Sequence, residues 1–158
     1  MVHPGDGNNN HLVEQGRIEN GQRVLDLGCG TATLSILIKK SQPGVDVIGI
    51  DRDRKIIEVA ELKTRKEGVN IPLFDAVVFD LPCRDNYFDR VFASMLFHRL
   101  TTKDKILAAE EMYGILKPGV ELHVADFGRP QKPSWRASRA SCVILKRWTT
   151  ISRGFCRM

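Results

Sequence analysis

Short apolar segments alternate along the chain with stretches whose apolar residues recur at helical spacing. The apolar segments predict buried strands at residues 23–27, 45–50, 69–74, 90–95 and 120–125. Helical spacing predicts helices after the first, second and fourth of these strands. Because this alternation is typical of parallel sheets with helical crossovers, the sequence predicts a doubly wound α/β fold with a mainly parallel sheet of about five strands.

Turn and breaker residues set the ends of these elements. Gly68 is placed to end a helix at residues 54–66, and Thr101 begins a capping box for the next helix. Pro72 weakens the third strand and places it at a sheet edge. Residues 117–119, Lys-Pro-Gly, are predicted to end the last helix. The apolar face of that helix is predicted to be Ile106, Ala109, Tyr113 and Leu116.

The two ends of the chain differ in composition from its centre. We expect residues 1–20 to form a short N-terminal cap that is partly disordered. Pro, Gly, Asp and Asn discourage regular structure over residues 3–10, and a short helix is predicted at residues 12–18. Residues 129–158 are expected to form a basic helical tail. Its apolar residues at helical spacing are Ile144, Trp148, Ile151 and Phe155.

The net charge of +5 comes from 24 Lys and Arg against 19 Asp and Glu among 158 residues. The excess lies in the tail, because residues 129–158 hold eight basic residues and no acidic one. Such a tail can contact nucleic acid or an anionic membrane. We favour a helix that covers the core, and we expect no nucleic acid partner, because the basic residues are not interleaved with aromatic residues on strands.

The lack of a recognisable targeting signal and the spacing of the cysteines point to the reducing interior of the cell. The longest apolar runs fall far short of the ~20 residues that a transmembrane helix needs, and the first twenty residues lack a secretory signal. The cysteines Cys29, Cys83, Cys142 and Cys156 are widely spaced and form no C-x-x-C pair. We therefore predict a cytoplasmic protein with no disulfide scaffold and no metal site.

The most informative segment is residues 24–32, VLDLGCGTA, in which a predicted strand runs directly into two glycines. Gly28 and Gly30 allow the backbone to turn sharply and to approach a ligand closely. Asp51 follows the second predicted strand, where a carboxylate can accept hydrogen bonds from both hydroxyls of a ribose. Together these residues predict a ligand that carries adenosine.

The rest of the loop narrows the class of ligand. A dinucleotide-binding loop would have a third glycine at position 33, where this chain has Thr33, and the Gly-Lys-Ser/Thr of a phosphate-binding loop does not occur. Asp26 precedes Gly28 by two residues, where its charge would repel a pyrophosphate and attract an ammonium group. A ligand with a positive amino-acid portion is therefore favoured, and an NAD or nucleotide-sugar enzyme is the alternative with the same fold.

Four ordered motifs resemble the class I S-adenosylmethionine-dependent methyltransferases, in the small-molecule branch (methyltransferase type 11) that includes ubiquinone- and menaquinone-biosynthesis-like enzymes. The motifs are VLDLGCGTATLS, VIGIDRD, LPCRDNYFDRVFASMLFHRL and LKPGVELHVADFGRP, within residues 22–130. The resemblance implies a Rossmann-like fold and a domain at residues 21–128 that binds S-adenosyl-L-methionine. It also implies in-line methyl transfer to an undetermined small-molecule acceptor.

The resemblance also implies roles for particular residues. Residues 26–30 would hold the methionine part of the cofactor, Asp51 the ribose and residues 75–78 the adenine, while residues 94–98 would face the methyl group. His98 is the candidate general base, whereas His123, inside a strand, is expected to be structural. The candidate cofactor-binding residues are Asp26, Leu27, Gly28, Cys29, Gly30, Asp51, Arg52, Asp75, Val77 and Ser94.

The chain departs from the family pattern at several points. Ala32 stands where the family loop usually has a third glycine, and Val77 and Val78 stand at an Asp-Ala pair whose acid meets the adenine, unless the loop is remodelled so that Asp75 substitutes. The last two strands of the family are expected to be absent, which would leave a sheet edge open to a partner or to self-association. A degenerate remnant that binds the cofactor without catalysis is therefore the second alternative.

Overall fold

Five parallel strands form one sheet in the order β3-β2-β1-β4-β5. In the computed structural model, which describes residues 6–126, the strands are β1 (Arg23–Leu27), β2 (Asp46–Asp51), β3 (Leu73–Asp75), β4 (Phe88–Ser94) and β5 (Leu116–Ala125). The chain builds outward from β1 in one direction and then returns to its other side with β4. The order therefore reverses between β1 and β4, which opens a crevice at the carboxyl ends of these strands.

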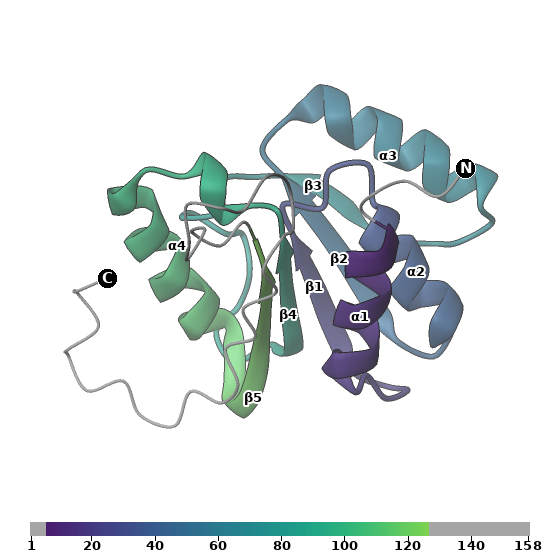
Figure 1. Cartoon of the computed structure of the whole chain (residues 1–158), viewed down its shortest axis with the longest axis horizontal. Coiled ribbons are helices and arrows are strands. Elements are labelled where there is room, and N and C mark those ends of the chain that lie inside the picture. The colour runs from purple at the N-terminus through teal and green to yellow at the C-terminus, as the bar shows by residue number, and fades with distance from the viewer. Residues whose placement is uncertain (1–5, 127–158) are drawn as a thin grey trace, which may run out of the picture.

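Helices cover both faces of the sheet, so the described residues form three layers (Figure 1). The helices α1 (Asp6–Gly16), α2 (Thr33–Ser41) and α3 (Arg54–Lys66) lie on one face, and α4 (Thr102–Ile115) lies on the other. A short 3₁₀ helix, η1 (Phe97–Arg99), joins β4 to α4. This architecture confirms the predicted α/β fold and the predicted order of its strands and helices.

Alternation along the strands divides the core into two clusters. Val24 of β1 and Phe92 of β4 belong to the cluster beneath α1, α2 and α3. Leu25 and Leu27 point the other way, into the cluster beneath α4. Both clusters contain side chains with no exposed surface, so β1 is covered on both faces, as is usual for a central parallel strand.

Several predicted boundaries agree with the structure. Helix α3 spans the predicted residues and is followed by Gly68 with a φ of 69°. Thr101 caps α4 as predicted, because its side chain accepts a hydrogen bond from the Asp104 N–H. Strand β3 lies at a sheet edge, which confirms the predicted position of this weak strand, but it spans only Leu73–Asp75, immediately after Pro72, rather than the predicted residues 69–74.

The predicted apolar face of α4 is wrong. The buried residues of this helix are Ala108, Met112 and Ile115, whereas Ile106 and Tyr113 are 44% and 54% exposed. The two sets of residues both recur at helical spacing, so the pattern alone could not distinguish them. The core beneath α4 selects the set that faces the sheet.

The N-terminal prediction also needs correction, because α1 already begins at Asp6, within the stretch expected to be disordered. Leu12 of α1 has no exposed surface and packs into the core, as does Ile18 just after the helix. This burial stabilises a helix whose composition alone disfavours it. The predicted helix at residues 12–18 therefore starts earlier and ends at Gly16.

Strand β5 begins at Leu116 rather than at the predicted Val120, but its pairing is irregular at the start. Leu116 pairs with Phe88, and regular pairing resumes only at Glu121, opposite Arg90. The intervening Lys-Pro-Gly segment interrupts the ladder because proline lacks an N–H donor. The predicted tail at residues 129–158 lies outside the described residues.

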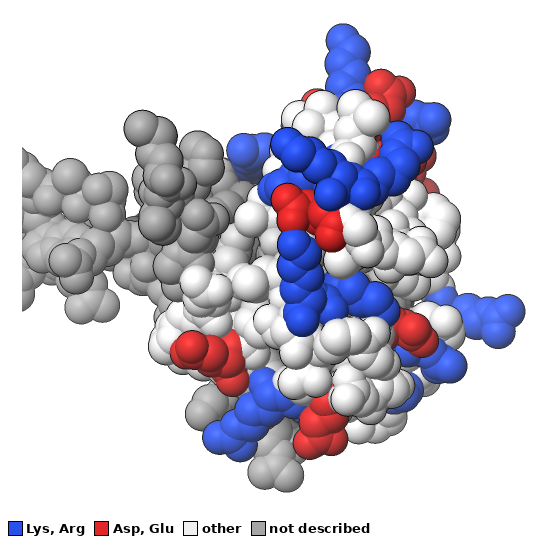
Figure 2. Space-filling model, turned by 90° about the vertical axis from the view of Figure 1, so that its right-hand side faces the viewer, with Lys and Arg blue, Asp and Glu red and all other residues white. Residues whose placement is uncertain are grey.

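The surface formed by α2 and α3 carries both signs of charge. Figure 2 shows Lys and Arg side chains over this face with Asp and Glu side chains between them. Lys40 and Glu67 form one such pair across the two helices, and Arg54 and Glu58 form another along α3. Within residues 6–126, no helix has the length and apolar character needed to cross a membrane.

Candidate functional site

The carboxyl ends of all five strands bring polar residues to one edge of the sheet. The glycine-containing loop at residues 28–32 follows β1, and Asp51 and Asp75 are the last residues of β2 and β3. Ser94 is the last residue of β4, residues 95–98 follow it, and Asp126 follows β5. The sheet therefore brings together segments that are far apart in the sequence, at the edge where parallel sheets bind ligands.

The loop after β1 is fixed by its backbone. The N–H groups of Gly28 and Cys29 both donate to the Ile50 carbonyl, at 2.8 and 3.0 Å. Gly28, Gly30 and Ala32 have φ values of 73°, 54° and 59°, in the left-handed region. Two of these positions are glycine, for which this conformation carries no steric cost. Ala32, which stands where the family loop usually has a third glycine, adopts the same left-handed conformation with a side chain.

The two glycines have different surroundings. A Cβ atom added at Gly28 would lie 2.9 Å from the Leu96 side chain, whereas one added at Gly30 would meet nothing within 4 Å. Gly28 is therefore needed for packing between the loop and the turn after β4. Gly30 faces open space, into which a ligand can approach the backbone.

Asp51 joins this loop to the end of β2. Its Oδ2 accepts a hydrogen bond from the Gly30 N–H at 3.0 Å, and its Oδ1 accepts one from the Asp53 N–H at 3.0 Å. Each carboxylate oxygen can accept more than one hydrogen bond, so Asp51 can hold the loop and still receive a ligand hydroxyl. Arg52 is exposed beside it.

Asp26 lies beneath the loop rather than on its surface. Asp26 is 1% exposed. Its Oδ2 accepts hydrogen bonds from the Ser35 hydroxyl at 2.6 Å and from the Ser35 N–H at 3.1 Å. Burial raises the pKa of the Asp26 carboxyl to about 6, the Ser35 bonds offset part of this rise, and the nearby Asp51 adds to it. A positive ligand group close to Asp26 would favour its charged form.

The structure places Asp75, rather than Val77, beside Asp51. Asp75 is the register partner of Asp51 in the parallel pair β2 and β3, and its Oδ2 lies 3.5 Å from Nη1 of Arg54. Val77 follows the strand and is 36% exposed, while Val78 is 5% exposed and packs beneath the loop. Residues 76–80, between β3 and Leu81, therefore form a loop whose apolar residue Val78 packs into the core.

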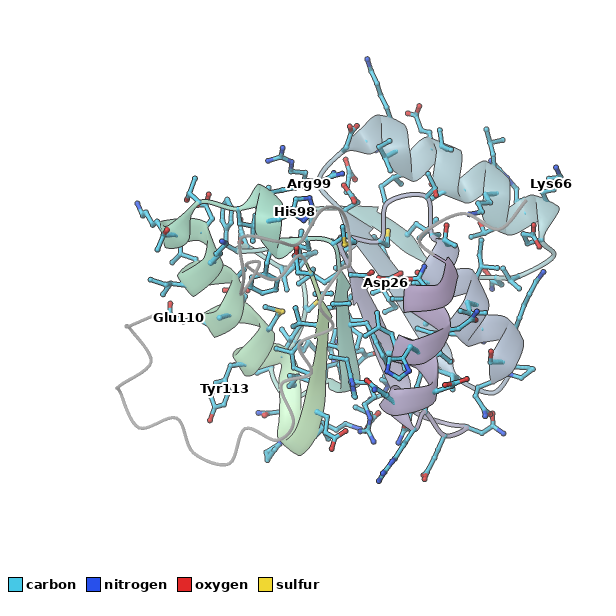
Figure 3. All side chains as sticks on the ribbon, in the orientation of Figure 1. Asp26, Lys66, His98, Arg99, Glu110 and Tyr113 are labelled. Carbon is cyan, nitrogen blue, oxygen red and sulfur yellow. The ribbon has the colours of Figure 1, made fainter. Side chains whose placement is uncertain are left out.

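The end of β4 and the turn that follows it form another side of the candidate site. Ser94 donates a hydrogen bond from its hydroxyl to Oδ1 of Asn9, from α1, at 3.3 Å. His98 lies in η1, where its Nδ1 is 2.9 Å from Oδ1 of Asp126 and its N–H donates to Asp126 Oδ2 at 3.1 Å. Figure 3 shows His98 at the upper edge of the sheet on the α4 side, and Asp26 on the side of α1 and α2.

The surroundings of Cys29 and His123 fit a role in packing rather than in chemistry. Cys29 is 8% exposed, and burial together with the charges of Asp26 and Asp51 holds the pKa of its thiol well above the usual range. This does not suit a thiolate nucleophile. His123 is 1% exposed in β5 and stacks on the Phe92 ring, with 4.9 Å between ring centroids, as expected for a structural residue.

Sequence reasoning missed Asn9 and the contact that Asp126 makes with His98. Asn9 falls in the stretch expected to be disordered, so it gave no signal. Asp126 was visible as a polar residue at the end of a predicted strand, but nothing in the sequence indicated that it would contact His98. That contact depends on the pairing of β4 with β5.

Comparisons with known proteins agree with this geometry. The profile of the family described as "Methyltransferase domain" matches residues 24–119. The demethylmenaquinone methyltransferase of Thermus thermophilus is 32% identical over 111 residues, which cover 70% of this chain and 50% of that protein. A counterpart from Listeria welshimeri is 32% identical over 122 residues, covering 76% and 51%.

Solved structures share the fold. A SAM-dependent methyltransferase from Aquifex aeolicus superposes with a TM-score of 0.72 at 22% identity, covering 85% of this chain and 73% of that one. The structure described as the [4+2]-cyclase SpnF gives 0.71 at 24% identity, covering 77% and 44%.

A doubly wound sheet with a glycine loop and a following acidic strand end defines a Rossmann-like nucleotide-binding protein. The family match makes this class specific: the chain belongs to the class I S-adenosylmethionine-dependent methyltransferases. It spans about half the length of the curated relatives that it matches.

Proposed function

We propose that this chain binds S-adenosyl-L-methionine at the carboxyl edge of its sheet and transfers the methyl group to a small-molecule acceptor. The observation that carries the proposal is the bond between the Gly30 N–H and Asp51, at 3.0 Å, beside the open space in front of Gly30. It joins a backbone that a ligand can approach closely to a carboxylate that can receive ribose hydroxyls.

The residues present fit this cofactor. The backbone at residues 27–30, with the side chain of Cys29 turned into the core, would surround the methionine portion, and the buried carboxylate of Asp26 would balance its ammonium group. Asp51 would accept hydrogen bonds from the ribose, with Arg52 at the rim. Asp75, in register with Asp51, would approach the adenine, and the exposed apolar side chain of Val77 would pack on its ring.

When bound, the cofactor supplies an electrophilic methyl group on a positively charged sulfur. The protein then needs to align the acceptor and to exclude water, which can supply up to ~7–11 kcal/mol. Ser94 and His98 lie in the turn that would face the methyl group. His98 would act as the general base for an acceptor that must lose a proton.

The names of the relatives suggest a first acceptor to test. The matched proteins from Thermus and Listeria are named demethylmenaquinone methyltransferases, so a naphthoquinol is our first candidate. We place the reaction in the cytoplasm and expect no nucleic acid substrate. The outer edge of β5, the last strand in the described order, is a candidate surface for a partner or for self-association.

Binding without methyl transfer is the second candidate function. The loop that follows Asp75 does not have the family's acidic residue at position 77, and one structural neighbour is named for a cyclase rather than for methyl transfer. Saturable binding of the cofactor without turnover of any quinol, lipid or amine acceptor would support this alternative. An NAD or nucleotide-sugar enzyme is disfavoured by Thr33, which lies at the first position of α2.

Calorimetric titration with S-adenosylhomocysteine, and separately with NAD, tests the proposal. We expect saturable binding of the first ligand only. Asp51→Ala should weaken it by ~1.5–3 kcal/mol, the scale of a hydrogen bond to a charged group, or about 10- to 150-fold. Because Asp51 also anchors Gly30, part of this loss would come from the loop.

Asp53→Ala is the matched control, because Asp53 is a neighbouring carboxylate that caps α3 by accepting a hydrogen bond from the Lys55 N–H at 2.9 Å. It should cost about 1 kcal/mol of stability and leave binding within about twofold. Absence of binding to the folded wild-type protein at millimolar ligand would refute the proposal. Equal affinities for the Asp51→Ala variant and the wild type would remove Asp51 from the site.

A further inference from the structure

Asp126 has no role in the proposed cofactor site, yet it is tightly integrated with the turn that carries His98. The parallel pairing of β4 and β5 sets Ser94 opposite Ala125. Beyond this pair, the Met95 N–H donates to the Ala125 carbonyl at 2.7 Å. The chain after β4 therefore bends over the end of β5, which brings Asp126 beneath η1.

The carboxylate of Asp126 contacts His98 at two points. Its Oδ2 accepts a hydrogen bond from the His98 N–H at 3.1 Å, and its Oδ1 lies 2.9 Å from the ring Nδ1. The Asp126 side chain is 13% exposed and the His98 side chain 31%. One bond holds the backbone of the histidine and the other holds the rotation of its ring, so the largely buried Asp126 carboxylate orients the imidazole.

This contact also determines which ring nitrogen carries the proton. An ionised carboxylate can only accept hydrogen bonds, so Nδ1 of His98 must be the donor. In the neutral ring the lone pair then lies on Nε2, and the same carboxylate stabilises the positive charge that forms when Nε2 takes a proton. Orientation, tautomer and charge compensation are the three contributions that a carboxylate makes to a histidine base.

The turn that carries His98 is coupled to the glycine loop. Leu96, two residues before His98, is the side chain that a Cβ at Gly28 would meet at 2.9 Å. Ser94, at the start of the turn, is bonded to Asn9 of α1. The His98 and Asp126 pair therefore belongs to the same edge as the loop, and its place relative to that loop is fixed by packing.

We propose that Asp126 is the positioning residue for His98, and that the pair serves an acceptor whose hydroxyl must lose its proton, such as a phenol or a quinol. This inference rests on the proposed function. As the O–H bond of the acceptor breaks, its proton passes to Nε2 of His98 and an N–H bond forms. The new bond from the acceptor to the methyl carbon replaces the bond between that carbon and the sulfur of the cofactor, which leaves as the neutral thioether S-adenosylhomocysteine. An acceptor such as catechol keeps the methyl group on its oxygen, whereas a quinol methylated at a ring carbon releases the hydrogen of that carbon as a proton and regains its hydroxyl, so one proton is lost in either case. The imidazolium then releases this proton to water, so the charge on the protein is restored.

The first test measures the tautomer of His98 in the full chain. Long-range proton–nitrogen correlation spectra of the ¹⁵N-histidine-labelled protein, at a pH where the ring is neutral, report which nitrogen is protonated. The chain has four histidines, so His98→Gln identifies the signal. We expect the Nδ1–H tautomer in the wild type and its loss in Asp126→Ala. A wild-type ring protonated on Nε2, or a tautomer unchanged by Asp126→Ala, would overturn the proposal.

The second test measures turnover with a short-chain demethylmenaquinol and with catechol. Asp126→Asn, which keeps an oxygen that can accept from the His98 N–H, should lower kcat by about 10²-fold. It should leave the KM for the cofactor and the affinity for S-adenosylhomocysteine within about twofold. Because the two residues act as one unit, the double variant with His98→Gln should be no slower than His98→Gln alone.

Glu110→Gln is the matched control, since it also removes one carboxylate. Figure 3 shows Glu110 on the outer side of α4, away from His98, and it should leave kcat unchanged. If Asp126→Asn binds S-adenosylhomocysteine and turns over as fast as Glu110→Gln, Asp126 is not a positioning residue and the proposed function stands.

If the wild type binds no S-adenosylhomocysteine, the proposed function fails, and the inference that depends on it fails too. If the cofactor binds and neither acceptor reacts, the tautomer decides between the remaining outcomes. An Nδ1–H ring that is lost in Asp126→Ala supports Asp126 as the positioning residue, and any other tautomer refutes it.

Discussion

The two edges of the sheet use their charged residues in opposite ways. At the amino edge Asp89 is surrounded by donors: its Oδ2 accepts from the Arg23 N–H at 2.9 Å and its Oδ1 from Lys117 Nζ at 2.6 Å. At the carboxyl edge the buried Asp26 accepts hydrogen bonds from the N–H and hydroxyl of Ser35, and Asp51 accepts from the backbone N–H groups of Gly30 and Asp53. Asp89 is thus paired with a cation, whereas Asp26 and Asp51 form no ion pair within residues 6–126.

This difference shows in the pKa values of the Asp26 and Asp89 carboxyls. Burial raises the pKa of Asp26 to about 6. Burial also acts to raise the pKa of Asp89, but the Arg23 N–H and Lys117 outweigh it, so the pKa of Asp89 lies below its ordinary value. The amino edge thus gains stability from its carboxylate, while the carboxyl edge sacrifices stability. Sites that bind ligands commonly show such a cost, and a cationic cofactor would offset it.

The largest effect should come from closing the open space at the carboxyl edge. Gly30→Ala places a methyl group where we propose that the cofactor approaches the backbone, so binding of S-adenosylhomocysteine should fall by about 100-fold or more. The left-handed conformation should cost the variant about 1–2 kcal/mol of stability. Calorimetric titration and urea unfolding measure the two effects separately.

Gly68→Ala is the matched control for this substitution. Gly68 has a φ of 69°, and a Cβ added there would also meet nothing within 4 Å, but it follows α3 at a distance from the loop in sequence and fold. We expect the same loss of stability with unchanged affinity. Similar affinities for the two alanine variants would show that Gly30 does not line the cofactor site.

The second prediction removes the buried charge. Asn in place of Asp26 can still accept from Ser35 but carries no charge, so Asp26→Asn should be more stable than the wild type by roughly 3 kcal/mol at pH 7.5. The pKa of Asp26 is higher in the folded state than in the unfolded state. Its favourable contribution is therefore complete below about pH 3.8 and is lost as the pH rises to about 6.

Urea unfolding of wild type and Asp26→Asn between pH 4 and pH 7.5 measures this difference, which should grow with pH. Asp46→Asn, at an exposed position at the start of β2, should show no such trend. We also expect Asp26→Asn to bind the cofactor more weakly, because the ammonium group would lose its counter-charge. A variant that is no more stable than the wild type at pH 7.5 would contradict the cost assigned to this edge.

Local sequence indicated that the glycine loop and Asp51 belong together, but it did not indicate the contact between His98 and Asp126. The glycine loop and Asp51 are joined by a bond between residues 21 apart, within one strand-helix-strand unit whose geometry its own turn residues determine. His98 and Asp126 are 28 residues apart, and they meet only because β5 pairs with β4 in one particular register. Nothing local to either residue encodes that register.

The same reasoning explains which helices were predicted correctly from the sequence and which were not. Helix α3 was predicted with its observed bounds because its apolar residues recur at helical spacing and Gly68 follows its end. The buried face of α4 was not, because apolar residues occur on two sides of this helix and the sheet chooses between them. Helix α1 is stabilised by burial of Leu12 in the core. No residue at the start of this helix signals that burial, so the sequence did not predict where α1 begins.

The smallest effect is predicted at the amino edge. Asp89→Asn exchanges charged hydrogen bonds for neutral ones, with Lys117 left without its counter-ion, so it should cost about 1–2 kcal/mol of stability at pH 7. The pKa of Asp89 is lowered in the folded state. Its contribution is therefore present above the unfolded value and is lost as the pH falls, which is the opposite trend to that of Asp26.

Asp85→Asn is the control for Asp89→Asn, because Asp85 is an exposed carboxylate in the turn just before β4. It should change stability by less than about 0.5 kcal/mol. Neither variant should alter the affinity for S-adenosylhomocysteine, since both residues lie at the far edge of the sheet. Asp89 also bonds the start of β1, so a loss of cofactor affinity in Asp89→Asn alone would mean that strain at the amino edge reaches the glycine loop through this strand. The division of the sheet into a stabilising edge and a binding edge would then be wrong.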